Sequence, residues 1–320
     1  MQSVEAAIGV LLARDEVTVA PWRGVALRVA ALLERGDLAV DALVRLVSAD
    51  PGMTVRVLAA AAARSGGEAP ASIPLAVARI GEPALLAIAR EAAAGAGERG
   101  ALDPLRRAAW RDAVGAAMLA AALARARGLD PDAAWLCGLL HDVGRLAALS
   151  LVERLAGGAR CDTGPGLRSQ RLVDRWRISI GVSVADRHGL PRVVAEVIAL
   201  DGCELPAAER ELAFVRIVRT AAAIARAVRE EEPQEGDAAA LEDLGEAEAE
   251  RLAPAVAALP SALAALEAWS PTERAREQRG SPDAAGSPLR ESRGEGVRLR
   301  VAGCEYVATG VAPLQLVVAG

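Results

Sequence analysis

The sequence has no lysine and no asparagine, so all 37 of its basic side chains are arginines. We interpret this as a bias in nucleotide composition and not as a sign of function. Aromatic residues make up only 2%, and the 52% of hydrophobic residues are mostly Ala, Leu and Val. Few aromatic and few β-branched residues in an Ala- and Leu-rich chain favour helices over strands. The sequence therefore predicts an all-α fold.

Several other absences argue against whole classes of protein. The net charge is -5, which is unlike the clustered positive charge of a nucleic-acid-binding face. No C-x-x-C pair occurs, which argues against a disulfide scaffold or a structural zinc site and suits a reducing compartment. Met1–Val10 has no basic segment typical of a signal peptide, and the uncharged stretches are too short to span a bilayer. We therefore predict a cytoplasmic protein that binds neither nucleic acid nor membrane.

Only one place in the chain can support metal chemistry. The sequence has no G-x-S-x-G motif and no phosphate-binding glycine-rich motif, and it contains just two histidines. One of them stands next to an aspartate, His141-Asp142, in the segment Leu136–Leu146. A vicinal His-Asp pair offers a divalent ion both an imidazole nitrogen and a carboxylate oxygen. The function therefore depends on which partners this pair has.

Turn signals divide the chain into four parts. Residues 1–100 read as short helices, residues 101–268 as a longer helical bundle, and residues 269–295 as a flexible linker rich in Ser, Pro, Gly and charge. Residues 296–320 form a short β-like tail. There Val297–Val301 alternates as a strand does, and Tyr306–Val318 offers a partner strand.

Local signals also predict individual helices. Asp50-Pro51 is an N-cap followed by a proline at the first helical position, leading into Met53–Ala63. Ser72-Ile73-Pro74 starts another helix, which Gly81 is expected to break. Asp103-Pro104 begins a long helix that ends at Arg127, and a single helix over Asp132–Leu149 carries the His-Asp pair. On that helix a leucine-rich stripe faces one side, so we expect His141 and Asp142 to face a cleft, a neighbouring helix or water.

Five segments in order resemble the HDOD domain, an output domain of bacterial signalling proteins related to the HD phosphohydrolases. They are Leu46–Thr54 (LVSADPGMT), Ser72–Gly81, Trp110-Arg111-Asp112, Gly138–Arg145 (GLLHDVGR) and His188–Pro191 (HGLP). The resemblance covers roughly residues 15–268. It implies a multi-helical bundle with an N-terminal helical subdomain and a role in bacterial signal transduction.

The chain departs from the catalytic pattern of the HD superfamily at its metal ligands. Such enzymes hold metal with a His, the His-Asp pair and a distal Asp. Here Asp112 stands at the first His position, and Ile217–Ala222, where the resemblance places the distal Asp, offers no carboxylate. The Asn-Ser of the family falls on Ala62-Ala63, and the Trp of its late turn is replaced by His188.

These departures leave two main interpretations of function. The first is a non-catalytic regulatory module that needs no cofactor and binds signalling proteins or a ligand. The alternative is a divergent phosphohydrolase for a nucleotide or cyclic dinucleotide, in which Asp112, His141 and Asp142 hold one divalent metal ion. A third interpretation is a cavity that binds a nucleotide without turnover. The first interpretation is preferred because three ligands are few for a catalytic metal. A homo-oligomer is compatible with each of them.

Two further residues have simpler explanations than metal binding. Cys137 lies four residues before His141, but we interpret it as a small buried hydrophobic residue. His188 precedes Gly189 and is expected at a helix C-terminus, where partial positive charge is favourable.

Overall fold

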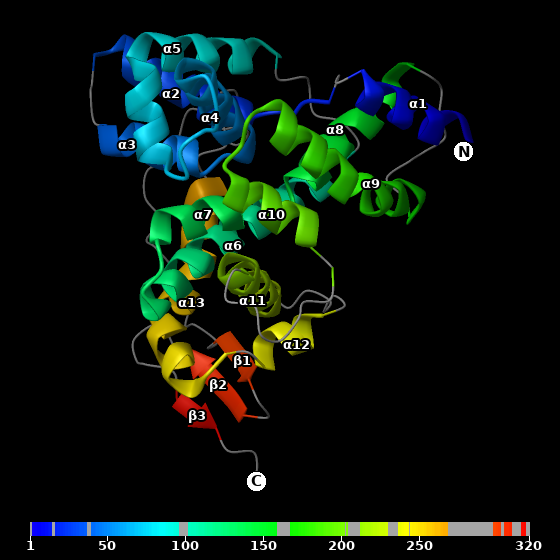
Figure 1. Cartoon of the computed structure of the whole chain (residues 1–320). Coiled ribbons are helices and arrows are strands. Elements are labelled where there is room, and N and C mark those ends of the chain that lie inside the picture. Colours follow the sequence, from blue (N-terminus) through cyan, green and yellow to red (C-terminus); the bar gives the residue numbers. More distant parts are fainter. Residues whose placement is uncertain are drawn as a thin grey trace, which may run out of the picture.

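The computed structural model describes the chain except for residues 1, 15–16, 37–39, 96–101, 159–166, 202, 204–211, 230–235, 243, 268–296, 302–303, 309–314 and 318–320. The predicted linker, 269–295, therefore lies outside the described residues. The described part is helical apart from three short strands near the C-terminus (Figure 1), which confirms the all-α prediction. Its first helices are α1 Gln2–Ala13, α2 Arg23–Glu34, α3 Val40–Ser48, α4 Pro51–Ser65 and α5 Ile73–Gly95.

The first of the remaining helices, α6, begins at Asp103, as predicted. These helices are α6 Asp103–Arg127, α7 Pro131–Leu140, α8 Val143–Gly158, α9 Leu167–Arg187, α10 Arg192–Leu200, α11 Ala213–Val228, α12 Asp237–Glu242 and α13 Glu246–Glu267. The strands are β1 Val297–Val301, β2 Cys304–Ala308 and β3 Gln315–Val317. They form an antiparallel sheet in the order β1-β2-β3, so the predicted strand at 297–301 is confirmed.

The helices form three tiers (Figure 1). Helices α2 to α5 pack together at one end, α6, α7 and α10 lie in the middle, and α11 and α12 lie beyond them towards the sheet. Helix α13 runs along α6, from the sheet to the level of α7. Helix α1 lies against α9, apart from α2 to α5. Within α5, Gly81 has φ 72° and ψ 169°, a backbone conformation that side chains disfavour, so the helix bends at the glycine that the sequence marks as a break.

One continuous apolar core runs through these tiers. It is built mainly from Ala, Leu and Val side chains, as the composition predicts, and α6 alone buries Val114, Leu119 and Leu123 completely. Small alanines let neighbouring helices approach closely, which compensates for the scarcity of large aromatic side chains. This explains how so few aromatic residues suffice for a chain of this size.

The turn between α3 and α4 joins the N-terminal helices to the bundle. The Trp110 indole on α6 donates to the carbonyl oxygen of Ala49 at 2.8 Å, and the Trp135 indole on α7 donates to that of Ser48 at 3.2 Å. The Asp50 side chain is fully buried and accepts from the backbone N–H of Met53 at 3.1 Å and of Trp22 at 2.7 Å. Asp50 thus caps α4, as predicted, and also fixes the start of α2.

Two helical stretches, Pro131–Leu155 and Glu246–Glu267, are long and apolar enough to cross a membrane by length and composition alone. The most apolar window of the first is 78% buried within the fold, which is the pattern of a core helix. The second is only 33% buried, because α13 lies at one edge of the molecule.

We expect Asp50→Ala to lower the free energy of unfolding by about 2–4 kcal/mol, because it leaves two backbone N–H groups without an acceptor in the interior. Urea denaturation followed by circular dichroism measures the change. The matched control is Asp130→Ala, since Asp130 caps α7 in the same way but is exposed. The control should lose about 1 kcal/mol, and equal losses for the two variants would contradict a special role for Asp50.

Candidate functional site

The His-Asp pair lies in a short turn between two helices. Helix α7 ends at Leu140 and α8 begins at Val143, so the prediction of a single helix over Asp132–Leu149 is wrong. The sequence hides this break because His141 keeps helical backbone angles, φ -53° and ψ -39°, and the apolar spacing continues across the turn. The backbone N–H of Arg145 donates to the carbonyl oxygen of Asp142 at 3.0 Å and starts the new helix.

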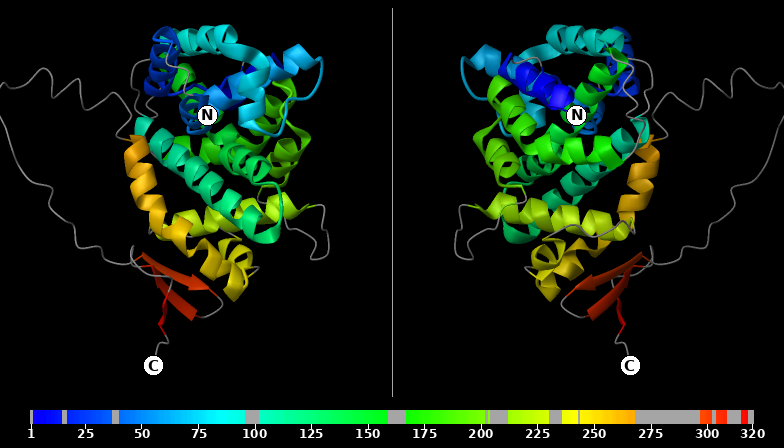
Figure 2. Two further views of the ribbon diagram at one scale, coloured as in Figure 1. Left: turned by 90° about the vertical axis from the view of Figure 1, so that its left-hand side faces the viewer. Right: turned by 90° about the vertical axis from the view of Figure 1, so that its right-hand side faces the viewer.

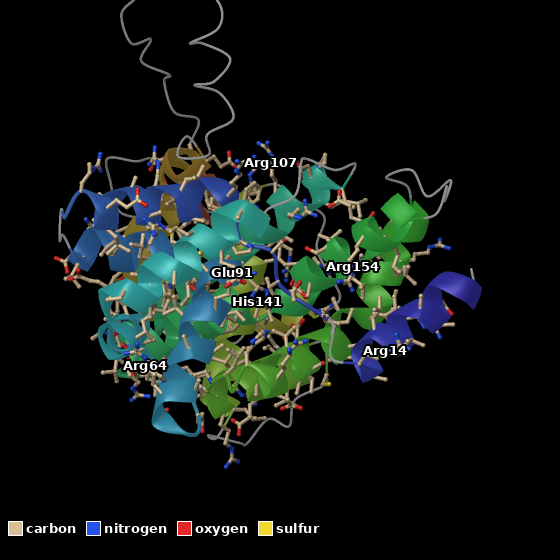
Figure 3. All side chains as sticks on the ribbon, turned by 90° about the horizontal axis from the view of Figure 1, so that it is seen from above. Arg14, Arg64, Glu91, Arg107, His141 and Arg154 are labelled. Atoms are coloured by element: carbon tan, nitrogen blue, oxygen red, sulfur yellow. The ribbon has the colours of Figure 1, made fainter. Side chains whose placement is uncertain are left out.

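His141 is a buried side chain, 7% exposed, and lies near the middle of the molecule when viewed from above (Figure 3). Its Nδ1 lies 2.8 Å from the carbonyl oxygen of Gly138, so Nδ1 carries the hydrogen that is donated. The ring is therefore fixed against the last turn of α7. Cys137, one turn earlier, is fully buried as predicted, and burial raises the pKa of its thiol to about 12.

Asp142 binds two arginines. Its Oδ2 accepts from Arg145 Nε at 2.6 Å and its Oδ1 accepts from Arg177 Nη1 at 3.1 Å, while only 16% of the side chain is exposed. Each arginine also binds a second carboxylate: Arg145 binds Asp174 at 2.7 Å, and Arg177 binds Asp201. This cluster, which we call the Asp142 clamp, ties the α7–α8 turn to α9 and to the end of α10.

The charges of the clamp keep Asp142 ionised. Burial acts to raise the pKa of Asp142, but the neighbouring charges of Arg145, Arg177 and His141 outweigh it and hold the pKa below its ordinary value. Burial likewise acts to lower the pKa of Arg145 and of Arg177, and the carboxylates outweigh it and raise both. Asp142 is thus an anion at neutral pH, and its oxygens accept hydrogen bonds from guanidinium groups.

The close contact between α8 and α9 makes the clamp possible. A Cβ added to Gly144 would lie 1.8 Å from the carbonyl oxygen of Arg177 and 2.6 Å from the backbone nitrogen of Gly181. Only a glycine permits this approach of two backbones. The glycine of the His-Asp motif therefore has a structural reason here: it brings α9, and with it Arg177, against Asp142.

Asp112, the third candidate ligand, is bound to a different arginine. It lies on α6 and forms an ion pair with Arg229, which follows the last turn of α11. Among the described residues no group of three His, Cys, Asp or Glu side chains is placed to hold a metal ion. Asp112, His141 and Asp142 thus occupy ligand positions of the family motifs, but their side chains do not form a metal-binding group.

The segment that lacks the distal carboxylate lies on α11 and faces the core. Ile217, Val218 and Ala221 are buried. The Thr220 hydroxyl oxygen lies at hydrogen-bonding distance from two carbonyl oxygens, 3.0 Å from that of Arg216 and 2.9 Å from that of Ala240. His188 follows the end of α9, as predicted, and its backbone N–H donates to the carbonyl oxygen of Val184 at 3.1 Å.

A pocket lies elsewhere, between the start of α2, the first turns of α6 and the end of α13. It is lined by Trp22, Gly24, Val25, Arg107, Trp110, Leu266 and Glu267. The two indoles meet edge to face with centroids 6.0 Å apart. None of the candidate ligands Asp112, His141 and Asp142 lines this pocket.

Comparisons with known proteins agree with this architecture. A family model described as HDOD domain matches residues 20–199. The chain is similar to the MmoQ response regulator of Methylococcus capsulatus str. Bath, with 22% identity and a TM-score of 0.57 over 75% of this chain and 98% of that chain. A structure of a fragment of MmoQ gives 24% identity and a TM-score of 0.56 over 72% and 92%.

An HDOD domain protein of Geobacter sulfurreducens is 23% identical over 78% of this chain and 91% of that chain, with a TM-score of 0.37. No curated protein sequence matches the chain. At such identities the MmoQ structures show a common fold, and the properties of this site come from its own residues.

We expect Asp142→Asn to lower the free energy of unfolding at pH 7 by about 1–3 kcal/mol, because two arginines lose a charged partner. The folded-state pKa of Asp142 lies below 3.8, so its contribution is present above pH 3.8 and is lost as the pH falls through the lower value. Denaturation of both proteins from pH 7 down to pH 3 should therefore show the difference shrinking with acid. Asp174→Asn, at a side chain 48% exposed, is the control and should cost at most about 0.5 kcal/mol.

Gly144→Ala should destabilise the fold by more than about 3 kcal/mol, since the added methyl collides with backbone that cannot move away. Gly9→Ala on α1, where a Cβ meets nothing within 4 Å, is the control and should be neutral or stabilising. Thermal unfolding of both variants measures the effect. A Gly144→Ala protein as stable as the control would mean that α8 and α9 do not need this contact.

Proposed function

The chain belongs to the HDOD family, and we propose that it is a non-catalytic regulatory module of bacterial signalling that acts by binding, in the cytoplasm, and not by hydrolysis. The observation that carries the proposal is the Asp142 clamp. The carboxylate that a phosphohydrolase would give to its metal here accepts hydrogen bonds from Arg145 and Arg177, at 2.6 Å and 3.1 Å. Asp112 is committed to Arg229 in the same way.

Electrostatics makes these positions unsuited to a divalent cation. A metal bound to Asp142 would displace two guanidinium groups from its oxygens and would then lie next to their positive charges. Both arginines are largely buried, with 19% and 17% of the side chains exposed, so solvent screens this repulsion weakly. The residues present therefore do not fit the metal of the HD superfamily, and we derive no reaction step through one.

The proposed regulatory role is supported by membership of the HDOD family and by one protein of similar structure. MmoQ is described as a response regulator, a class of protein that passes on a signal, and it shares this fold. The HDOD resemblance likewise implies a role in signal transduction. We propose that the output is a conformational state recognised by a partner protein, or set by a bound nucleotide.

The test is the metal content and the activity of the full chain, purified without a metal-affinity column and compared with His141→Ala. Elemental mass spectrometry should give the same background for both proteins, and neither should hydrolyse bis(p-nitrophenyl) phosphate or cyclic dinucleotides with added Mn²⁺. About one divalent ion per chain that His141→Ala loses, together with hydrolysis, would overturn the proposal in favour of a divergent phosphohydrolase.

The same samples test the nucleotide-binding form of the proposal. A ligand that binds only the folded chain raises its melting temperature in proportion to its occupancy. Cyclic dinucleotides that raise the melting temperature without being consumed would identify the ligand that sets the state. No shift at millimolar concentration would leave a protein partner as the source of the signal.

A further inference from the structure

One cavity in the described part of the chain takes no part in the proposed function: the pocket at the start of α2. Its empty volume is about 410 Å³, including the part that opens to solvent. Its walls come from the start of α2, the first turns of α6 and the end of α13. Trp110 is buried, whereas Trp22, Val25 and Leu266 are only half-buried. Apolar surface thus remains uncovered inside a concave site, which is the usual setting of small-ligand binding.

Two indoles give the pocket an aromatic wall. The rings of Trp22 and Trp110 meet edge to face, with their centroids 6.0 Å apart and their planes at 67°. The Trp110 ring is held by its hydrogen bond to the carbonyl oxygen of Ala49, and the backbone of Trp22 by its bond to Asp50. Aromatic walls that are already held in place lose little freedom when a ligand binds, and they interact well with another flat ring. The wall therefore favours an aromatic group.

The charges at the pocket leave one arginine without a partner. Of the two charged residues that line it, Glu267 accepts a hydrogen bond from Arg111, so its charge is balanced within the fold. Asp103, one turn before Arg107, accepts from Arg106 at 2.8 Å. Among the described residues, no hydrogen bond or ion pair joins Arg107 to another residue. Arg107 lies at the margin of the molecule in Figure 3, where a ligand can reach it.

The start of α2 adds to the positive potential at the pocket. Gly24 and Val25, which line the pocket, belong to the first turn of α2. The first N–H groups of a helix have no acceptor within the helix, and no side chain caps α2. These groups carry partial positive charge, which attracts anions. The helix start and the Arg107 guanidinium therefore favour the same sign of ligand charge.

We propose that this pocket binds a small carboxylate that carries an aromatic ring. The ring lies against the indoles of Trp22 and Trp110, and the carboxylate accepts hydrogen bonds from the guanidinium of Arg107, a pairing that is strong when both N–H groups of one edge take part. A cationic ligand would also stack on indoles, but it would meet the unpaired charge of Arg107 and the positive start of α2.

The binding site is independent of the metal question, because none of the three candidate metal ligands lines it. A ligand here contacts α2, α6 and α13 at once, next to the hydrogen bonds that hold the α3–α4 turn. It would thus act on the junction between the N-terminal helices and the bundle. Its role as an input signal rests on the proposed function, whereas its binding does not.

Isothermal titration calorimetry of the full chain with three probes tests the proposal. Phenylacetate should bind with a dissociation constant of about 1 mM or tighter, as expected for a ligand of so few atoms. Benzylamine, which has the same ring and the opposite charge, and acetate, which has no ring, should each bind at least about tenfold more weakly. Tighter binding of benzylamine, equal binding of acetate, or no binding of phenylacetate would each overturn the proposal.

Two variants test the assigned contacts. Arg107→Gln should weaken phenylacetate binding at least about tenfold, because the carboxylate loses its charged partner. Arg14→Gln is the matched control, at an exposed arginine on another side of the molecule (Figure 3), and should bind as the wild type does. Leu266→Trp should abolish binding by filling the pocket while Arg107 stays in place. Each variant should keep the melting temperature of the wild type without ligand, and phenylacetate binding that survives Arg107→Gln or Leu266→Trp would contradict the proposal.

Discussion

The packing of α9 against α7 and α8 depends on one largely buried carboxylate, Asp142, held between two guanidinium groups. Arg145 comes from the first turn of α8, but Arg177 comes from α9, so the charge of Asp142 fixes α9 against the α7–α8 turn. The contact of Gly144 with the α9 backbone is the steric counterpart of this ion pair. Loss of the close contact at Gly144 would move Arg177 away from Asp142. Loss of the charge on Asp142 would leave largely buried arginines without this partner, which is costly.

A second polar cluster has the corresponding role in the N-terminal tier. Two tryptophans of the bundle donate to the α3–α4 turn, and Asp50 holds that turn to the start of α2. Burial raises the pKa of Asp50 to about 6, even though the backbone N–H groups of Met53 and Trp22 act to lower it. The polar positions of the family motifs thus serve here to join helices, which is consistent with a module that transmits a state through its framework.

Much of the fold can be predicted from the sequence because its signals are local. Asp50-Pro51, Asp103-Pro104 and Gly81 mark helix starts and a break through backbone chemistry alone. The break at His141 leaves no such mark, and the approach of α9 to Gly144 beside it is a contact between residues more than thirty positions apart. The regular spacing of apolar residues across this segment indicates only a local preference for helix.

The candidate site shows the same limit more clearly. The order of motifs identifies Asp112, His141 and Asp142, and the missing distal carboxylate is visible in the sequence. The arginines that bind the two aspartates are not, because Arg177 and Arg229 are two among 37 basic residues and only the packing of α9 and α11 selects them. Among the three arginines that bind these aspartates, only Arg145 stands at a helical spacing from its partner, three residues after Asp142, that can be recognised in the sequence.

A crystal structure of the chain grown in MnCl₂, with anomalous data collected at the manganese edge, tests the central claim most directly. The account predicts that Arg145 and Arg177 remain on Asp142 and that no anomalous peak lies within bonding distance of His141 or Asp142. A manganese ion bound to these residues, with either guanidinium displaced, would contradict it.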